Sequence, residues 1–118
     1  YMQGFGSYIR TQREALGETS KGYSLRSVAK KIGVEPAYLS KVERELVSPP
    51  SEAKVVTLAE VLGEDQDVLL AMAGKVSSDL LKVIRDRPAL FAELLRKLKV
   101  EPDHAVIRIV REVQDGQW

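Results

Sequence analysis

The chain has 118 residues, of which 44% are hydrophobic and 30% charged, and its net charge is +1. That length suits one domain, or one small domain with an appendage. The absence of cysteine excludes a disulfide framework and a thiolate metal site. No apolar run is long enough to span a membrane and no signal peptide is visible, so we expect a cytoplasmic protein without a membrane partner.

The first two predicted elements are short helices separated by a polar connection. Residues 5–16 have roughly helical apolar spacing, and Gly17 is typical of a C-terminal stop. A polar loop follows at 18–23. Ser24 is then expected to cap a second helix, because its hydroxyl can accept hydrogen bonds from the free amides of the first turn. That helix is predicted to end at Ile32.

Residues 25–42 have the apolar spacing of a helix-turn-helix. Ala29 supplies a small residue where the two helices touch, and Gly33 tolerates positive φ at the turn. Pro36 suits the first position of a third helix that runs to about Arg44. Apolar anchors at helical spacing hold this helix down, namely Val34, Leu39 and Val42. Its other face then projects into solvent, where a DNA major groove can accept it.

Proline, glycine and serine positions divide the rest of the chain into further helices. Helices are predicted at 51–62, 66–73, about 78–86 and 88–98. The last segment begins at Pro102 and Asp103 and is rich in β-branched residues, which leaves a strand open. The apolar positions 106, 109, 110 and 113 fit a helical period better. The expected fold class is therefore all-α.

Positive charge is concentrated around the helix-turn-helix. Between Lys21 and Arg44 there are six basic and two acidic residues, which gives +4, whereas residues 63–118 carry −1. This distribution is what a phosphate-binding footprint requires. A solvated basic face explains the charge equally well.

Residues from about Gly6 to Ala73 resemble the XRE family of DNA-binding domains, which have the five-helix fold of lambdoid phage repressors and Cro. The family's residue types recur at the family's spacing in Arg13, Val28-Ala29, Ile32-Gly33, Ser40, Val42-Glu43 and Pro49. The resemblance implies a lambda-repressor-like DNA-binding domain, which we place at 5–74, followed by a helical region at 75–118. It also implies a sequence-specific regulator of transcription that binds double-stranded DNA.

The chain departs from the family pattern at two places. The connection 18–23 is longer than usual and either rests on DNA phosphate through Lys21 or is slack. Glu45 stands where the family usually has glycine. If the backbone there requires positive φ, Glu45 is strained by about 1 kcal/mol.

Candidate base contacts lie at the start of the third helix. Lys41 is suited to donate to guanine, Glu35 to accept from cytosine, and Ala37 to meet a thymine methyl group. The competing interpretation is that Pro36 and Ala37 only begin a helix and that Glu35 caps it. The full set of candidates is Glu35, Pro36, Ala37, Ser40 and Lys41.

Candidate phosphate contacts surround the start of the second helix, where free amides favour an anion. The set is Ser24, Arg26, Ser27, Lys30, Tyr38 and Arg44. Such contacts position a protein on DNA without specifying sequence, and simple solvation is the alternative for Lys30 and Lys31. The resemblance further implies that Arg13 pairs with Glu43 and braces the third helix against the first.

No catalytic or metal-binding constellation is visible. His104 is the single histidine and has no cysteine or second histidine to share a metal. A general base is not apparent among the scattered carboxylates. We therefore expect neither an enzyme nor a cofactor.

The region 75–118 carries more apolar side chains than a small appendage can bury alone. We predict that it closes a homodimer through Leu90, Phe91, Leu94, Leu95, Leu98, Val106, Ile107 and Val110. A dimeric repressor would read two half-sites of a palindromic operator. The structural alternative is a helical layer that folds back on the DNA-binding domain. The functional alternative is an antitoxin-like or protease-regulated protein whose C-terminal region binds a regulatory partner protein.

Overall fold

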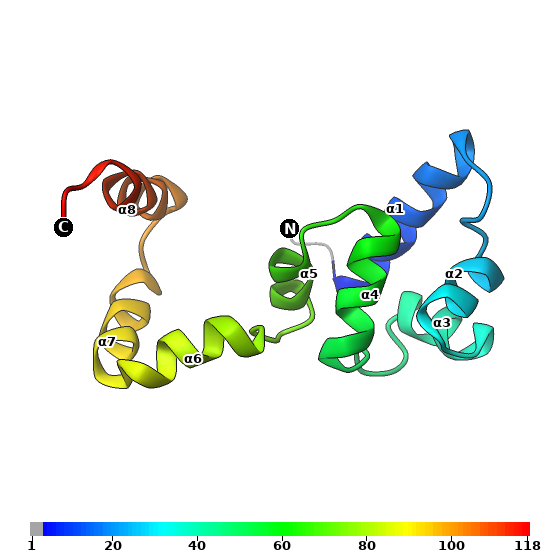
Figure 1. Ribbon diagram of the computed structural model, residues 1–118, viewed down its shortest axis with the longest axis horizontal. Coiled ribbons are helices and arrows are strands. Elements are labelled where there is room, and N and C mark those ends of the chain that lie inside the picture. Colours follow the sequence, from blue (N-terminus) through cyan, green and yellow to red (C-terminus); the bar gives the residue numbers. More distant parts are fainter. Residues whose placement is uncertain (1–3) are drawn as a thin grey trace. The chain divides into compact units, whose positions relative to one another are not determined.

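The structure is a computed structural model that describes residues 4–118. These residues form eight helices and no strand (Figure 1). The expected all-α class is therefore confirmed. The chain divides between Ser77 and Ser78 into two compact units, which we call the N-terminal unit and the C-terminal unit. Within the described part of the chain, no helix is long and apolar enough to cross a membrane.

Five helices make up the N-terminal unit, and they lie close to their predicted positions. Their bounds are α1 Phe5–Thr19, α2 Leu25–Ile32, α3 Pro36–Glu43, α4 Glu52–Leu62 and α5 Gln66–Met72. The prediction that Gly17 ends the first helix is wrong. The helix continues to Thr19, where the Ser20 amide donates to the Leu16 carbonyl at 3.0 Å. An interior glycine costs a helix only about 1 kcal/mol, so other contacts can carry the helix past it.

Caps and turns that were expected from local residue types are present. The Ser27 amide donates to Ser24 Oγ at 3.1 Å, so Ser24 caps α2 as predicted. Gly33 has φ 76° and ends α2, and the following Val34 amide donates to the Ala29 carbonyl at 2.9 Å. This left-handed turn sets the angle at which α3 leaves α2.

The core of the N-terminal unit is built from the apolar faces of all five helices. α1 packs against α3 and α4, α2 packs against the same two helices, and α4 packs against α5. Ala29 is fully buried, which lets α2 approach its neighbours closely. Each fully buried leucine, isoleucine or valine contributes about 1.5–3 kcal/mol. The largest such side chains are Ile9, Val28, Leu39, Val42, Val55, Leu58, Leu69 and Leu70.

The turn that follows α3 is left-handed at a residue other than glycine. Glu45 has φ 61°, as expected if this chain keeps the family's backbone at that position. The Leu46 amide donates to the Lys41 carbonyl at 2.9 Å, which closes the last turn of α3. A residue with a side chain costs about 1–2 kcal/mol in the left-handed conformation. Glu45 follows the end of α3 in sequence, and α3 is the helix that carries the candidate base contacts.

The C-terminal unit consists of three helices, α6 Ser78–Asp86, α7 Pro88–Leu98 and α8 Asp103–Asp115. The last segment is thus a helix, as its spacing favoured, and the strand alternative is wrong. Unlike the helices of the N-terminal unit, α6, α7 and α8 contain no buried residue.

Candidate nucleic-acid interface

A buried ion pair joins α1 to α3. Arg13 Nε and Nη2 donate to the two carboxylate oxygens of Glu43 at 2.7 and 2.8 Å. Only 12% of the Arg13 side chain and 5% of the Glu43 side chain are exposed. The hydrogen bonds to Glu43 raise the pKa of the Arg13 guanidinium, so the charge remains in place at any physiological pH. The ion pair that the resemblance implied is present.

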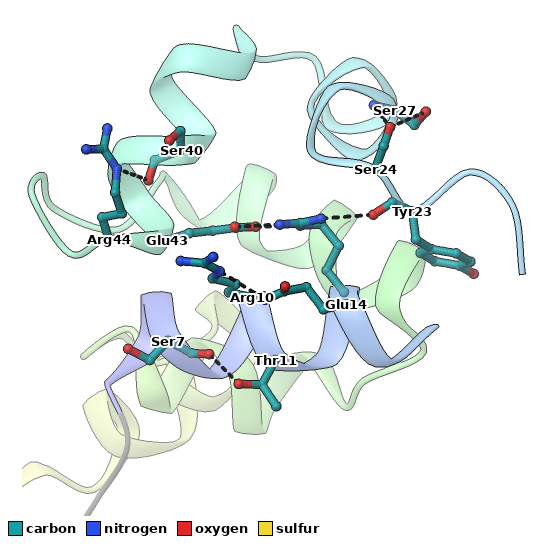
Figure 2. Close-up of polar contacts among 11 residues, drawn as sticks. Ser7, Arg10, Thr11, Glu14, Tyr23, Ser24, Ser27, Ser40, Glu43 and Arg44 are labelled. Atoms are coloured by element: carbon teal, nitrogen blue, oxygen red, sulfur yellow. Dashed lines mark hydrogen bonds and ion pairs between the residues drawn. The ribbon is translucent and has the colours of Figure 1, made fainter. Parts of the chain in front are cut away.

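The same guanidinium makes a third hydrogen bond. Arg13 Nη1 donates to the Tyr23 carbonyl at 3.1 Å, so Glu43 and Tyr23 lie on opposite sides of one charged group (Figure 2). Tyr23 precedes the N-cap of α2. One side chain on α1 therefore fixes both the end of α3 and the entry to α2.

The five candidate base-contacting residues are spread along α3: Glu35 is its N-cap, Pro36 and Ala37 begin the helix, Ser40 lies in its second half and Lys41 lies in its last turn. Glu35, Ala37 and Lys41 are exposed, and Pro36 and Ser40 are half-buried. Leu39, Val42 and Glu43 occupy the buried face of the helix. Because Ala37 and Lys41 are four residues apart, they share one exposed face. Glu35 is the N-cap residue, but its side chain makes no capping hydrogen bond among the described residues.

The candidate phosphate contacts fall into two groups. Ser24, Arg26, Ser27 and Lys30 belong to the first two turns of α2 and its cap, and Ser24 Oγ also donates to Ser27 Oγ at 2.9 Å (Figure 2). Arg26 and Lys30 are exposed. Arg44 is exposed at the end of α3, and its Nε donates to the Ser40 carbonyl at 3.3 Å.

Tyr38 differs from the other phosphate candidates because its ring is partly buried against the core. Most of its surface therefore contributes to packing. Its phosphate contact stays a prediction that concerns the hydroxyl group alone.

Two lysines have structural contacts that the sequence did not indicate. Lys31 Nζ donates to the Gly22 carbonyl at 2.9 Å and lies 5.0 Å from the centroid of the Tyr23 ring. Lys54 Nζ donates to the Gly33 carbonyl at 3.3 Å and so ties α4 to the turn between α2 and α3. Lys31 is exposed, so the interpretation of Lys31 as a solvated lysine is compatible with these two contacts. Of the connection predicted at 18–23, residues 18 and 19 belong to α1, and the Gly22 and Tyr23 carbonyls accept hydrogen bonds, so this connection is not slack.

Two further polar residues, Tyr8 and His104, lie outside the candidate interface. Tyr8 Oη donates to Glu64 Oε2 at 3.0 Å, and this hydrogen bond raises the pKa of Tyr8. His104 is exposed near the start of α8. Among the described residues, no group of three or more histidines, cysteines, aspartates or glutamates is placed to hold a metal ion.

The predicted dimerisation residues lie on α7 and α8. Leu90 and Leu95 are 66% and 57% exposed, and Phe91 and Leu98 are half-buried. A groove in this unit has apolar walls and charged edges of both signs, and it is lined by Leu94, Lys97, Leu98, Glu101, Ala105, Arg108, Ile109 and Glu112. The remaining predicted residues, Val106, Ile107 and Val110, are all exposed.

Comparison with known proteins identifies the family. Residues 9–69, which include all of α2, α3 and α4, match the sequence model of the helix-turn-helix family. The chain belongs to the XRE-type helix-turn-helix family. The matched residues contain the Arg13–Glu43 pair and every candidate DNA contact.

Several relatives are similar to this helix-turn-helix protein over more than half of its chain. Two Mycobacterium tuberculosis proteins, one from each of two strains, are 35% identical over 81 residues, which is 69% of this chain and 54% of theirs. Both are named as uncharacterized HTH-type transcriptional regulators. The HTH-type transcriptional regulator SinR of Bacillus subtilis is 36% identical over 72 residues, or 56% of this chain and 65% of SinR.

One chain of a solved SinR–SinI complex is also similar to this helix-turn-helix chain. The match covers 80% of this chain and 94% of the solved chain, at 31% identity and a TM-score of 0.47. The chain spans about half the length of the mycobacterial relatives it matches.

Proposed function

We propose that this chain is a sequence-specific, double-stranded-DNA-binding transcriptional regulator that acts as a dimeric repressor in the cytoplasm. The observation that carries the proposal is the exposed face of α3, which the Arg13–Glu43 pair holds against α1 while leaving Ala37 and Lys41 open. Membership of the XRE-type family and the names of the relatives support it. No step of this function requires an enzyme activity or a cofactor.

In this proposal α3 enters the major groove. Lys41 donates to guanine O6 or N7, Glu35 accepts from cytosine N4, and Ala37 contacts a thymine methyl group. Pro36 begins the helix and Ser40 precedes Lys41 in its second half. The two half-buried residues fit close against the DNA, whereas the longer Lys41 side chain reaches further into the groove.

The phosphate contacts come from the start of α2 and from the end of α3. Ser24, Arg26, Ser27 and Lys30 approach one stretch of DNA backbone, and Arg44 and the Tyr38 hydroxyl approach from α3. These contacts set the register of the protein on the duplex, and base contacts then select the sequence.

The C-terminal unit supplies the dimer interface. Its helices bury no residue in the single chain, and a unit of this size without a core of its own needs a partner to stay folded. The groove between α7 and α8 has both Lys97 and Arg108 and both Glu101 and Glu112 on its edges. Two-fold symmetry can place basic residues of one copy against acidic residues of the other.

The test is fluorescence anisotropy with the DNA upstream of the chain's own gene and with a scrambled duplex, over a range of salt concentrations. We expect tight binding to the native duplex alone, with about tenfold or greater preference at physiological salt. Equal and salt-labile binding to both duplexes would contradict sequence-specific recognition of this DNA.

The exposed apolar faces of α7 and α8 also favour a second candidate, an antitoxin-like or protease-regulated protein whose C-terminal unit binds a regulatory partner protein. Light scattering on the purified chain separates the two. A dimer mass at tens of micromolar supports the homodimer. A monomer mass would contradict the homodimer and favour a different protein partner for the exposed apolar faces.

A further inference from the structure

The connection between α1 and α2 is held by two cations that reach it from different helices. The Gly22 carbonyl accepts from Lys31 Nζ of α2 at 2.9 Å, and the Tyr23 carbonyl accepts from Arg13 Nη1 of α1 at 3.1 Å. The next residue, Ser24, caps α2. Three successive residues before α2 therefore have defined partners.

The Lys31 ammonium contacts two groups of the connection, the Gly22 carbonyl and the Tyr23 ring. Gly22 has φ 91°, a left-handed conformation that favours glycine, and a Cβ added there would lie 2.9 Å from Lys31 Nζ. The same ammonium lies 5.0 Å from the Tyr23 ring centroid, within range of a cation–π interaction. The turn thus brings one carbonyl and one ring to a single ammonium group.

The consequence of these contacts lies in the geometry of the proposed DNA interface. Arg13 joins the Tyr23 carbonyl to Glu43 on α3, which carries the candidate base contacts. Lys31 joins the segment 22–23 to α2, whose first turn carries the candidate phosphate contacts. Loss of the Lys31 contacts would free the Ser24 cap and Arg26 to move relative to α3.

We infer that Lys31 is a positioning residue for DNA binding, which acts through Gly22 and Tyr23 and does not itself contact phosphate. The inference rests on the proposed function, because it concerns how α2 meets the DNA backbone. Its neighbour Lys30 is the natural comparison. Lys30 is exposed, and no described residue accepts a hydrogen bond from its side chain.

The experiment measures DNA affinity by anisotropy and amide hydrogen exchange at residues 22–27 in the full chain. The variants are Lys31→Met, Tyr23→Leu, the double variant, Lys31→Arg and the control Lys30→Met. Tyr23→Leu removes the ring but keeps an apolar side chain where Tyr23 packs against the core, and it changes no charge.

We expect Lys31→Met and Tyr23→Leu each to speed exchange at 22–27 and to weaken operator binding about three- to tenfold. The double variant should bind about as weakly as Lys31→Met, because the loss of Lys31 already removes its contact with the Tyr23 ring. Lys31→Arg should bind almost as wild type, since a guanidinium also donates and stacks on a ring. Lys30→Met should leave the exchange unchanged.

Two results would overturn the inference. One is that Lys31→Met leaves operator binding unchanged, which would mean that its contacts with Gly22 and Tyr23 do not position α2 on DNA. The other is unchanged exchange at 22–27 in Lys31→Met. Failure of the proposed function looks different, because the wild-type chain itself would then show no preference for the operator duplex, and the inference about DNA would fall with it.

Discussion

The two units of this chain use similar helices in opposite ways. In the N-terminal unit, apolar faces from five helices meet in one core that includes Ile9, Leu39 and Leu58. In the C-terminal unit, α6, α7 and α8 have comparable lengths and apolar content, yet none of their residues is buried. Amphipathic helices alone do not make a core. The helices of the N-terminal unit bury one another's apolar faces, whereas the helices of the C-terminal unit contain no buried residue in the single chain.

The largest expected effect comes from breaking the ion pair that braces the N-terminal unit. Arg13→Ala leaves the Glu43 carboxylate buried without its partner, and we expect the free energy of unfolding to fall by about 3–5 kcal/mol. Arg10→Ala is the control on the same helix, because Arg10 and Glu14 form an exposed pair with 54% of each side chain accessible. Such a pair contributes about 0.5 kcal/mol. Similar losses in the two variants in urea denaturation would refute the brace.

The second prediction concerns the C-terminal unit. Leu90→Asp places a charge on a side chain that is 66% exposed in the single chain, so it should leave a monomer's stability unchanged. At a dimer interface it should raise the dimer dissociation constant about thirtyfold or more, because the charge loses its water. Sedimentation equilibrium measures the constant. Leu46→Asp in the N-terminal unit, 63% exposed, is the matched control and should not change it. Equal effects of the two variants would contradict the proposed interface.

The strained turn behind α3 offers a smaller test. Glu45→Gly removes the cost of a side chain at φ 61° and should make the chain about 1 kcal/mol more stable than Glu45→Ala. Both variants lose the carboxylate, so their difference in chemical denaturation isolates the backbone strain. If Glu45→Ala is as stable as Glu45→Gly, the left-handed turn carries no such cost.

The smallest effect is a pH dependence within the N-terminal unit. The hydrogen bond to Glu64 raises the pKa of Tyr8, so folding holds the phenolic proton more tightly than the unfolded chain does. This contribution is complete below the ordinary tyrosine pKa of about 10 and is lost as the pH rises through the higher folded pKa. Tyr8→Phe should therefore lower stability by about 0.5 kcal/mol at neutral pH, and the gap should close in alkali.

Tyr38→Phe is the control for that comparison, because no hydrogen bond from the Tyr38 hydroxyl exists among the described residues. A stability gap for Tyr8→Phe that stays constant from neutral pH to pH values above 10 would contradict the role of the Glu64 hydrogen bond.

Features that depend on neighbours in the sequence were predictable. Ser24 and Ser51 cap their helices, Pro36 begins α3, and Gly33 and Gly63 adopt the left-handed conformation that ends a helix. Each outcome follows from the bonding or steric properties of one residue in its own turn. The positive φ of Glu45 meets the condition under which strain is expected there, because spacing aligns Glu45 with a family glycine.

The family pattern implied the distant Arg13–Glu43 pair, but distant contacts that no family motif marks were not predictable. Gly17 had the residue type of a helix stop, but α1 continues to Thr19. Lys31 had the sequence context of a solvated lysine, and only the folded chain brings the Gly22 carbonyl and the Tyr23 ring to its ammonium. Lys54 reaches Gly33 for the same reason. No sequence periodicity or motif predicts which distant group a flexible lysine side chain contacts.

The central claim is that the exposed face of α3 reads DNA sequence, and the specificity of Lys41→Ala tests it most directly. The measurement is the ratio of affinities for the native upstream duplex and a scrambled duplex at physiological salt, by anisotropy, for wild type, Lys41→Ala and Lys99→Ala. Lys99 is an exposed lysine at the end of α7 and controls for loss of charge. We predict that Lys41→Ala lowers the ratio by a factor that corresponds to about 1–3 kcal/mol of binding free energy, while Lys99→Ala leaves the ratio unchanged. An unchanged ratio in Lys41→Ala, or equal losses in both variants, would contradict the claim.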